Sequence, residues 1–232
     1  MTVPLVLLPG MMCDARLFAA QFAAFSGTRT VISAPIGGHQ TMAALAKDVL
    51  ATLPRRFALA GLSMGGIVAM EMVRQAPERV AGLALMDTNP LAEHEDAKAR
   101  RMPQIEAVQA GNLRQVMRDE MKPNYLSDGP NQGAILDTCM AMATDLGDEV
   151  FINQSIALRD RPDQSDTLKS YQGPAVSLCG EEDSLCPISR HELMCDLLPD
   201  AELEIIQNAG HLPTLEQPET TNAALSRWLE RL

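Results

Sequence analysis

A single serine stands in a short glycine-rich turn between an apolar run and a helical pattern. The turn has the sequence Gly61-Leu62-Ser63-Met64-Gly65, after apolar residues 57–60 and before the helix-like residues 67–75. A serine on so sharp a turn needs glycines two residues away on both sides, because larger side chains would clash there. The turn also lifts the hydroxyl to the positive end of a helix dipole. Ser63 is therefore the predicted nucleophile, and Gly61 and Gly65 are the glycines that permit the turn.

A serine hydroxyl needs a base to take its proton, and the chain offers four histidines. His211 lies between the last predicted strand and the last predicted helix, at the edge where sites on open α/β sheets form. His94 lies among acidic residues, which favours a solvated helix. His191 falls inside a predicted helix as a surface or structural residue, and His39 follows two glycines in a turn. His211 is thus the predicted base.

The base in turn needs a carboxylate that orients the ring and stabilises its charge. Asp183 follows the predicted strand 175–179 and would stand beside the loop of His211. Asp87 ends the preceding predicted strand and is the rival, because sheets of this type can carry the acid after either strand. Asp183 is the predicted acid.

Acyl transfer also requires N–H groups that stabilise a negative oxygen in the transition state. One predicted donor is the backbone N–H of Met64, directly after the serine. The other is the backbone N–H of Met11, because Gly10 lets the loop after the first predicted strand approach closely.

Six apolar runs alternate with helical patterns and would position these residues. The predicted strands are residues 3–8, 30–34, 57–61, 80–86, 175–179 and 202–206. The predicted helices are residues 16–25, 42–53, 64–75, 189–198 and 220–232. Most of the strands are nearly continuous in hydrophobicity, which is typical of strands covered on both faces. The pattern predicts an α/β fold with a roughly six-stranded, mostly parallel sheet flanked by helices.

Residues 90–169 break this alternation, because they contain helix-compatible pieces and no convincing strand. The punctuating residues are Pro103, Gly111, Pro123, Pro130 and Gly147. The stretch is too long for a plain loop in a compact domain. We therefore expect a core of residues 1–89 and 170–232, with residues 90–169 as a helical insertion after the fourth strand.

Taken together, these segments resemble the α/β-hydrolase superfamily over nearly the whole chain. Residues 61–66 resemble its serine turn, residues 180–183 its G-x-x-D acid motif, and residues 209–219 its closing G-H…E-x-P segment. The resemblance implies the α/β-hydrolase fold with the insertion as a cap over the site, and it favours Asp183 over Asp87. The first loop departs from the family, with Pro9-Gly10 in place of the usual His-Gly.

The predicted activity is hydrolysis of a small carboxylic ester, lactone or thioester through an acyl-serine intermediate. Within the superfamily the sequence is similar to small bacterial esterases and enol-lactonases. It also resembles the lyase that forms succinyl-hydroxycyclohexadiene-carboxylate in menaquinone synthesis. A C–C hydrolase or lyase on the same three residues is therefore one alternative. A receptor that binds a small ligand without catalysis is another.

Composition limits the other classes of function. The formal net charge of -11 disfavours binding to nucleic acid and to anionic membranes. No stretch approaches the roughly 20 apolar residues that span a bilayer. The five cysteines lack metal-site spacing, so we expect reduced thiols in a cytoplasmic protein. We expect no metal and no organic cofactor, a small-molecule acyl substrate as the partner, and either a monomer or a homodimer.

Overall fold

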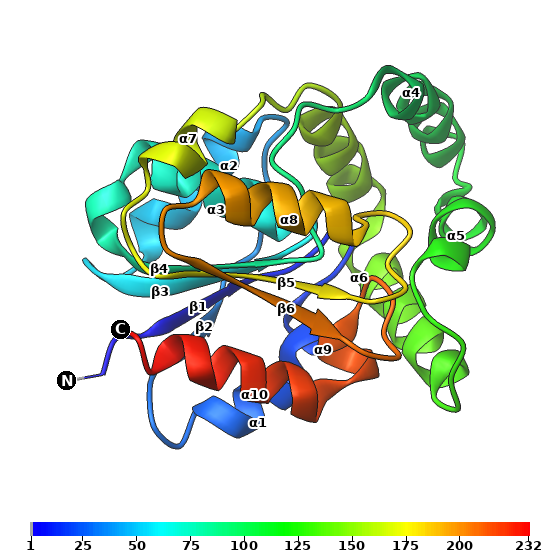
Figure 1. The fold of residues 1–232 in the computed structure, drawn as a ribbon. Helices are drawn as coiled ribbons and strands as arrows, with labels where there is room; N and C mark the ends of the chain where they lie inside the picture. Colours follow the sequence, from blue (N-terminus) through cyan, green and yellow to red (C-terminus); the bar gives the residue numbers. More distant parts are fainter. Residues whose placement is uncertain (1) are drawn as a thin grey trace.

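A six-stranded parallel sheet forms the centre of the structure, a computed structural model that describes residues 2–232 (Figure 1). The strand order is β2-β1-β3-β4-β5-β6, and every neighbouring pair is parallel. The strands are β1 (Leu5–Leu8), β2 (Val31–Ser33), β3 (Phe57–Leu62), β4 (Val80–Met86), β5 (Ala175–Gly180) and β6 (Ala201–Ile206). The predicted α/β fold is confirmed.

Helices cover both faces of this sheet. In Figure 1, α1 and α10 lie on one face, and α2, α3 and α8 lie on the other. Successive residues of β1 accordingly belong to different cores: Leu5 and Leu7 pack with α1 and α10, whereas Val6 and Leu8 pack with α2 and α3. The bounds of these helices are α1 (Ala19–Phe25), α2 (Met42–Thr52), α3 (Met64–Gln75), α8 (Ile188–Leu197), α9 (Pro213–Glu216) and α10 (Pro218–Leu229). Two short 3-10 turns are η1 (Ala15–Phe18) and η2 (Pro77–Arg79).

The segment between β4 and β5, residues 87–174, is helical as predicted. Most of it lies beyond the carboxyl ends of the strands, whereas its last helix, Ser165–Ser170, packs against α3 and α8 (Figure 1). We call it the β4–β5 segment. Its helices are α4 (Glu95–Gln109), α5 (Leu113–Val116), η3 (Met117–Met121), η4 (Lys122–Asn124), α6 (Gln132–Arg159) and α7 (Ser165–Ser170). The short α7 was not predicted. Among the described residues, no helix is both long and apolar enough to cross a bilayer.

Gly147 and Pro103 were both predicted to interrupt helices in this segment, and only Gly147 does so. Gly147 interrupts α6 with non-helical dihedrals, φ 79° and ψ 179°, so the helix kinks there. Pro103 was expected to end a helix but lies inside α4. A proline within a helix costs about 3 kcal/mol. Ile105 and Val108 are buried beyond it, and each buried aliphatic side chain contributes roughly 1.5–3 kcal/mol, which offsets that cost.

Candidate active site

Ser63 occupies a strained turn between β3 and α3. Its dihedrals are φ 53° and ψ -117°, a conformation that non-glycine residues rarely adopt. Hydrogen bonds from the adjacent strand end hold it: the Ser63 N–H donates to the Met86 carbonyl at 2.8 Å, and the Thr88 hydroxyl donates to the Ser63 carbonyl at 2.8 Å. The turn is therefore fixed by β4 and the residues that follow it.

The predicted glycines flank this turn where no side chain fits. A Cβ at Gly61 would collide with the backbone of Gly65, and a Cβ at Gly65 would collide with the carbonyl of Leu8. The start of α3 is thus pressed against the end of β1. The sequence argument for these two glycines has a direct steric basis in the structure.

The structure brings Ser63, His211 and Asp183 together in one hydrogen-bonded row. The Ser63 Oγ lies 2.9 Å from His211 Nε2, and His211 Nδ1 lies 2.8 Å from Asp183 Oδ2. Because an ionised carboxylate only accepts, Nδ1 carries the proton that faces Asp183. Nε2 is then free to accept from the serine hydroxyl. This arrangement can move a proton from Ser63 to His211.

Asp183 is buried yet held in its charged form. Burial alone would raise the pKa of its carboxyl, but the His211 ring and two backbone N–H groups lower it below its ordinary value. These groups are the N–H of Leu185 at 2.8 Å and the N–H of Cys186 at 3.1 Å, both donating to Oδ1. One oxygen is thereby fixed by the loop, and the other is left for the imidazole.

Asp87, the rival acid, has a different environment. Its side chain is fully buried, and Oδ1 accepts a 2.9 Å hydrogen bond from the Gly180 N–H. Oδ2 has no hydrogen-bond partner among the residues described, and the charged Asp183 lies nearby. Burial, with the adjacent charge of Asp183, raises the pKa of Asp87 well above its ordinary value. This environment favours the neutral form of Asp87.

Glu216 holds the loop of His211, a contact that the sequence analysis did not predict. Its carboxylate accepts from the N–H groups of Gly210 and Leu212, each at 3.0 Å. It also accepts from the backbone and hydroxyl of Ser127 at 2.9 Å, which ties the loop to the β4–β5 segment. The His211 N–H itself donates to a carbonyl of that segment, at Tyr125, at 2.7 Å.

The two predicted oxyanion donors, the N–H groups of Met11 and Met64, have no hydrogen-bond partner within residues 2–232. Met12, the residue after Met11, has a positive φ of 55°, and its N–H donates to Gln154 Oε1 at 2.9 Å. Gln154 lies buried on α6 and also donates to the Ile36 carbonyl at 3.2 Å. This glutamine, which no sequence pattern indicated, fixes the loop that carries Met11.

The other three histidines lie apart from this row. His39 is exposed and lies 3.6 Å from Asp48, and His94 caps the start of α4. His191, expected at the surface or in a structural place, is fully buried, with Nδ1 2.8 Å from the hydroxyl of Ser177. Burial lowers the pKa of His191 to about 4, so it is neutral at physiological pH.

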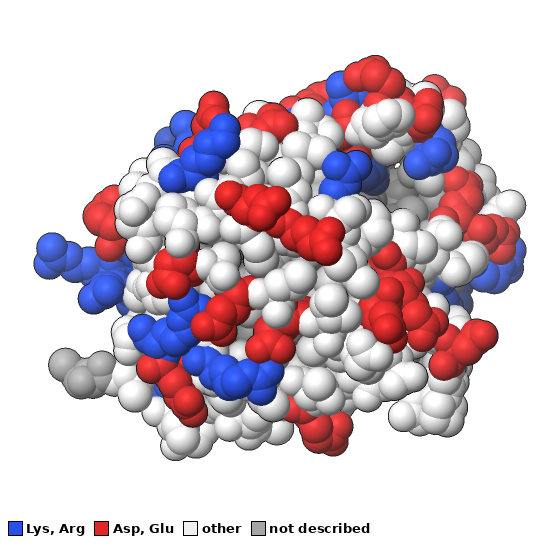
Figure 2. Space-filling view, viewed as in Figure 1, with Lys and Arg blue, Asp and Glu red and all other residues white. Residues whose placement is uncertain are grey.

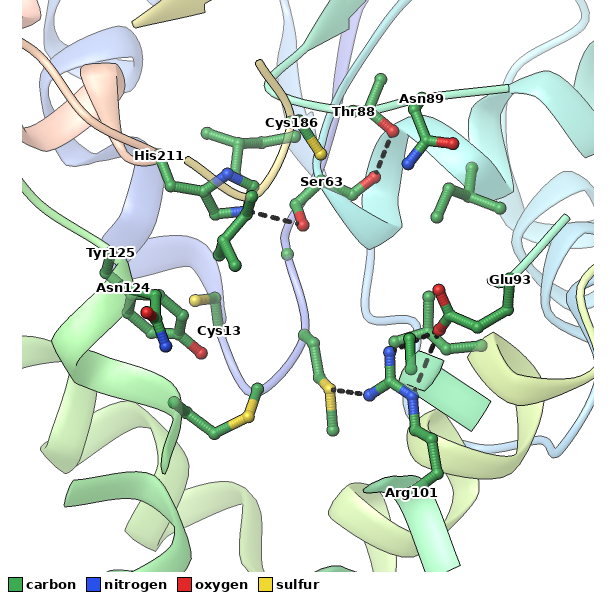
Figure 3. A pocket seen from close by; sticks show the side chains of 18 of the residues that line it. Cys13, Ser63, Thr88, Asn89, Glu93, Arg101, Asn124, Tyr125, Cys186 and His211 are labelled. Atoms are coloured by element: carbon green, nitrogen blue, oxygen red, sulfur yellow. Dashed lines mark hydrogen bonds and ion pairs between the residues drawn. The ribbon is translucent and has the colours of Figure 1, made fainter. Parts of the chain in front are cut away.

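A cavity of about 290 Å³ opens on Ser63 and His211 (Figure 3). Figure 2 shows a hollow below α4 with basic side chains at its rim. Apolar side chains also line the cavity, among them Met11, Leu62, Ile67, Leu158 and Leu212. Its charged lining residues all belong to the β4–β5 segment: Glu93, Arg100, Arg101, Glu120 and Arg161.

Asp183, Cys186 and His211 could in principle hold a metal ion, since one ligand atom of each lies within 4.8 Å of the others. Burial raises the pKa of the Cys186 thiol well above its ordinary value, which disfavours the thiolate that binds metals. A metal would also have to replace the hydrogen bond between Asp183 and His211. The donor set therefore suits proton transfer better than metal binding.

Comparisons with known proteins agree with this fold. Residues 5–224 match the model of the alpha/beta hydrolase family. A thermophilic esterase from Thermogutta terrifontis, solved with malate bound, superposes with a TM-score of 0.91 at 29% identity, covering 99% of this chain and 90% of that one.

Two curated relatives are also similar. The dihydrolipoyllysine-residue acetyltransferase component of the acetoin cleaving system from Pseudomonas putida is 27% identical over 98% of this chain. This chain spans only 64% of that protein's length. The pimeloyl-[acyl-carrier protein] methyl ester esterase of Aromatoleum aromaticum is 27% identical, over 77% of this chain and 76% of its own length.

A neutral Asp87 predicts that Asp87→Asn stabilises the protein increasingly as the pH rises. In the unfolded chain the pKa of this carboxyl is about 3.9. In the folded protein its pKa is higher, so the carboxyl keeps its proton to higher pH. Stability is therefore lost as the pH rises from the unfolded pKa towards the folded one. Asparagine can accept from Gly180 and carries no charge at any of these pH values, so it avoids that loss. We expect the melting temperature of the variant to exceed that of wild type by a few degrees at pH 8 and by less at pH 5.5. A difference that is constant or shrinks with pH would contradict a neutral Asp87.

Proposed function

The chain belongs to the alpha/beta hydrolase family, and on that premise we propose that it is a serine hydrolase that cleaves a small carboxylic ester. One observation carries the proposal: a hydrogen-bonded row of Ser63, His211 and Asp183 that faces a cavity. Two of the similar proteins are esterases by name, which supports the ester as the substrate bond.

In the proposed first half-reaction, the Ser63 Oγ attacks the ester carbonyl carbon while His211 Nε2 takes the hydroxyl proton. The carbonyl oxygen becomes negative, and the N–H groups of Met11 and Met64 donate to it. Asp183 stabilises the imidazolium through Nδ1–H. When the C–O bond to the alcohol breaks, His211 gives its proton to the leaving oxygen. The products are the free alcohol and an acyl group on Ser63.

In the second half-reaction, water takes the place of the alcohol. His211 removes a proton from the water, whose oxygen attacks the acyl carbon. The bond to Ser63 Oγ then breaks, and the serine recovers its proton from His211. The carboxylic acid leaves, and the protein returns to its starting state. The same steps would open a lactone, whose leaving oxygen stays attached to the acyl group, or cleave a thioester, whose leaving atom is sulfur.

The cavity lining and the position of the helical segment suggest how a substrate would lie. The apolar lining residues of the cavity, which include Ile67 and Leu158, suit the carbon chain of an acyl or alcohol group. We propose that residues 90–169 act as the cap over this chain, since they supply α4, α5 and α6 beyond the carboxyl ends of the strands (Figure 1). The remaining polar lining then determines which esters fit.

The proposal predicts that a fluorophosphonate probe labels wild type and fails to label Ser63→Ala. Hydrolysis of p-nitrophenyl acetate or butyrate should fall by about four or more orders of magnitude in this variant, because His211 then has no hydroxyl to activate. An unchanged melting temperature would exclude misfolding as the cause. If wild type neither reacts with the probe nor turns over these esters, a small-ligand receptor or a narrow lyase becomes the better assignment.

The acid can be tested by comparing two isosteric variants. Asp183→Asn should lower kcat about 10⁴-fold, because an amide can donate to His211 and so reverse its tautomer. Asp87→Asn should stay within a few-fold of wild type, since a neutral group replaces a neutral group. Steady-state kcat at pH 7.5 decides between them, and the opposite ranking would transfer the role of acid to Asp87.

The support of the Met11 loop can be tested at Gln154. Gln154→Leu leaves the Met12 N–H without its acceptor, and the shift of the neighbouring donor should lower kcat by about tenfold or more with little change in KM. Asn153→Leu is the matched control, because Asn153 on the same helix contacts Gly37 and Gln40 but not this loop. Equal kcat values for the two variants would refute a positioning role for Gln154.

A further inference from the structure

Three buried charges line the cavity on the side away from Ser63. Figure 3 shows Arg101 and Glu93 across the cavity from Ser63 and His211. Arg101 Nη2 lies 2.8 Å from Glu93 Oε2, and Arg161 Nη2 lies 3.1 Å from Glu93 Oε1. The side chains of Glu93 and Arg161 are only 7% and 8% exposed, and that of Arg101 is 14% exposed. One carboxylate thus faces two guanidinium groups.

This cluster carries one positive charge in excess, because guanidinium groups stay protonated in proteins. Arg100 and Glu120 also line the cavity, but both are exposed and of opposite sign, so they add no net charge. The excess is notable in a chain whose formal net charge is -11. A buried, uncompensated charge is unfavourable unless an ion of opposite sign pairs with it.

Two donors in the cluster remain available. Arg101 Nη1 contacts only the Met11 sulfur, at 3.5 Å, and a thioether is a weak acceptor. For Arg161, Nε donates to the Leu91 carbonyl at 3.0 Å, while Nη1 has no partner among residues 2–232. Burial lowers the pKa of Arg161, and the nearby Glu93 acts in the opposite direction. An anion in the cavity would satisfy both free donors and the excess charge.

We propose that the substrate carries a carboxylate at the end remote from its ester bond, and that Arg101 and Arg161 bind this carboxylate. Planar, paired donors of two arginines match the two oxygens of a carboxylate. One excess charge favours a monoanion over a phosphate monoester, which carries about -1.5 to -2 at pH 7. The cavity volume of about 290 Å³ restricts the substrate to a small one. The inference rests on the proposed function, because it takes Ser63 as the reacting centre.

Binding to Ser63→Ala tests the site without requiring turnover. By calorimetry, monomethyl adipate, an anion, should bind at least about tenfold more tightly than neutral dimethyl adipate, because charge-assisted hydrogen bonds contribute about 1.5–3 kcal/mol. If the carboxylate belongs to the alcohol part, 4-acetoxybutanoate should show the same advantage over its methyl ester. No advantage in either pair overturns the proposal.

Two further variants, each made in the Ser63→Ala protein, should change the affinity for the anion in opposite directions if the cluster binds it. Arg101→Gln should weaken binding of the favoured anion roughly tenfold and leave the neutral diester unchanged. Glu93→Gln removes the competing carboxylate and should tighten binding of the same anion. Arg114→Gln is the matched control, because Arg114 is an exposed arginine of the β4–β5 segment outside the cavity. If the cluster only joins α4 to the end of α6, both variants will weaken both ligands and lower the melting temperature.

Two further outcomes distinguish failure of the carboxylate site from failure of the proposed hydrolase function. If wild type hydrolyses dimethyl adipate in a Ser63-dependent manner with no preference for the monoanion, the proposed function stands and the carboxylate site fails. If Ser63→Ala binds the monoanion selectively but wild type cleaves no ester, the site stands and the hydrolase assignment fails. Stronger competition by inorganic phosphate than by acetate would assign the cluster to a phosphoryl group instead.

Discussion

The backbone of Ser63, held at φ 53° and ψ -117°, is the constraint on which the rest of the site depends. Such a conformation costs about 1–3 kcal/mol and persists only where its surroundings determine it. Here the end of β4 supplies two hydrogen bonds, and the absence of side chains at Gly61 and Gly65 allows α3 to start directly against β1.

The second constraint is electrostatic, since two carboxyl groups lie next to each other in a buried place. The loop after β5 gives Asp183 two backbone donors and the imidazole, whereas Asp87 receives one donor from Gly180. The unequal supply of donors decides which group is charged. Asp183 is thus held towards its charged form beside His211, whereas burial favours the neutral form of Asp87. Local loop geometry, rather than residue type, distinguishes the two aspartates.

That distinction shows what sequence patterns can and cannot predict. Ser63 and its glycines were predictable because the turn is a local feature, fixed by residues that adjoin it in the chain. The strands were predictable for the same reason. The residues alone left Asp87 and Asp183 as alternatives, because the choice depends on contacts between distant loops. Gln154 is a similar case, since nothing near it in the sequence indicates that it bonds Met12. Pro103 was wrongly expected to end a helix, because the burial of residues beyond it offsets the cost of a proline within a helix.

The parts of the cavity have different origins in the chain. The loops that follow β1, β3, β5 and β6 carry the groups that we propose to react, whereas the charged residues of the cavity lining come from the β4–β5 segment. On this proposal, recognition and reaction are encoded in separate stretches of sequence. In a diverging lineage, insertions or substitutions in one stretch could redirect the protein to new compounds while the other is inherited intact. Such a division makes new specificities reachable by few mutational steps.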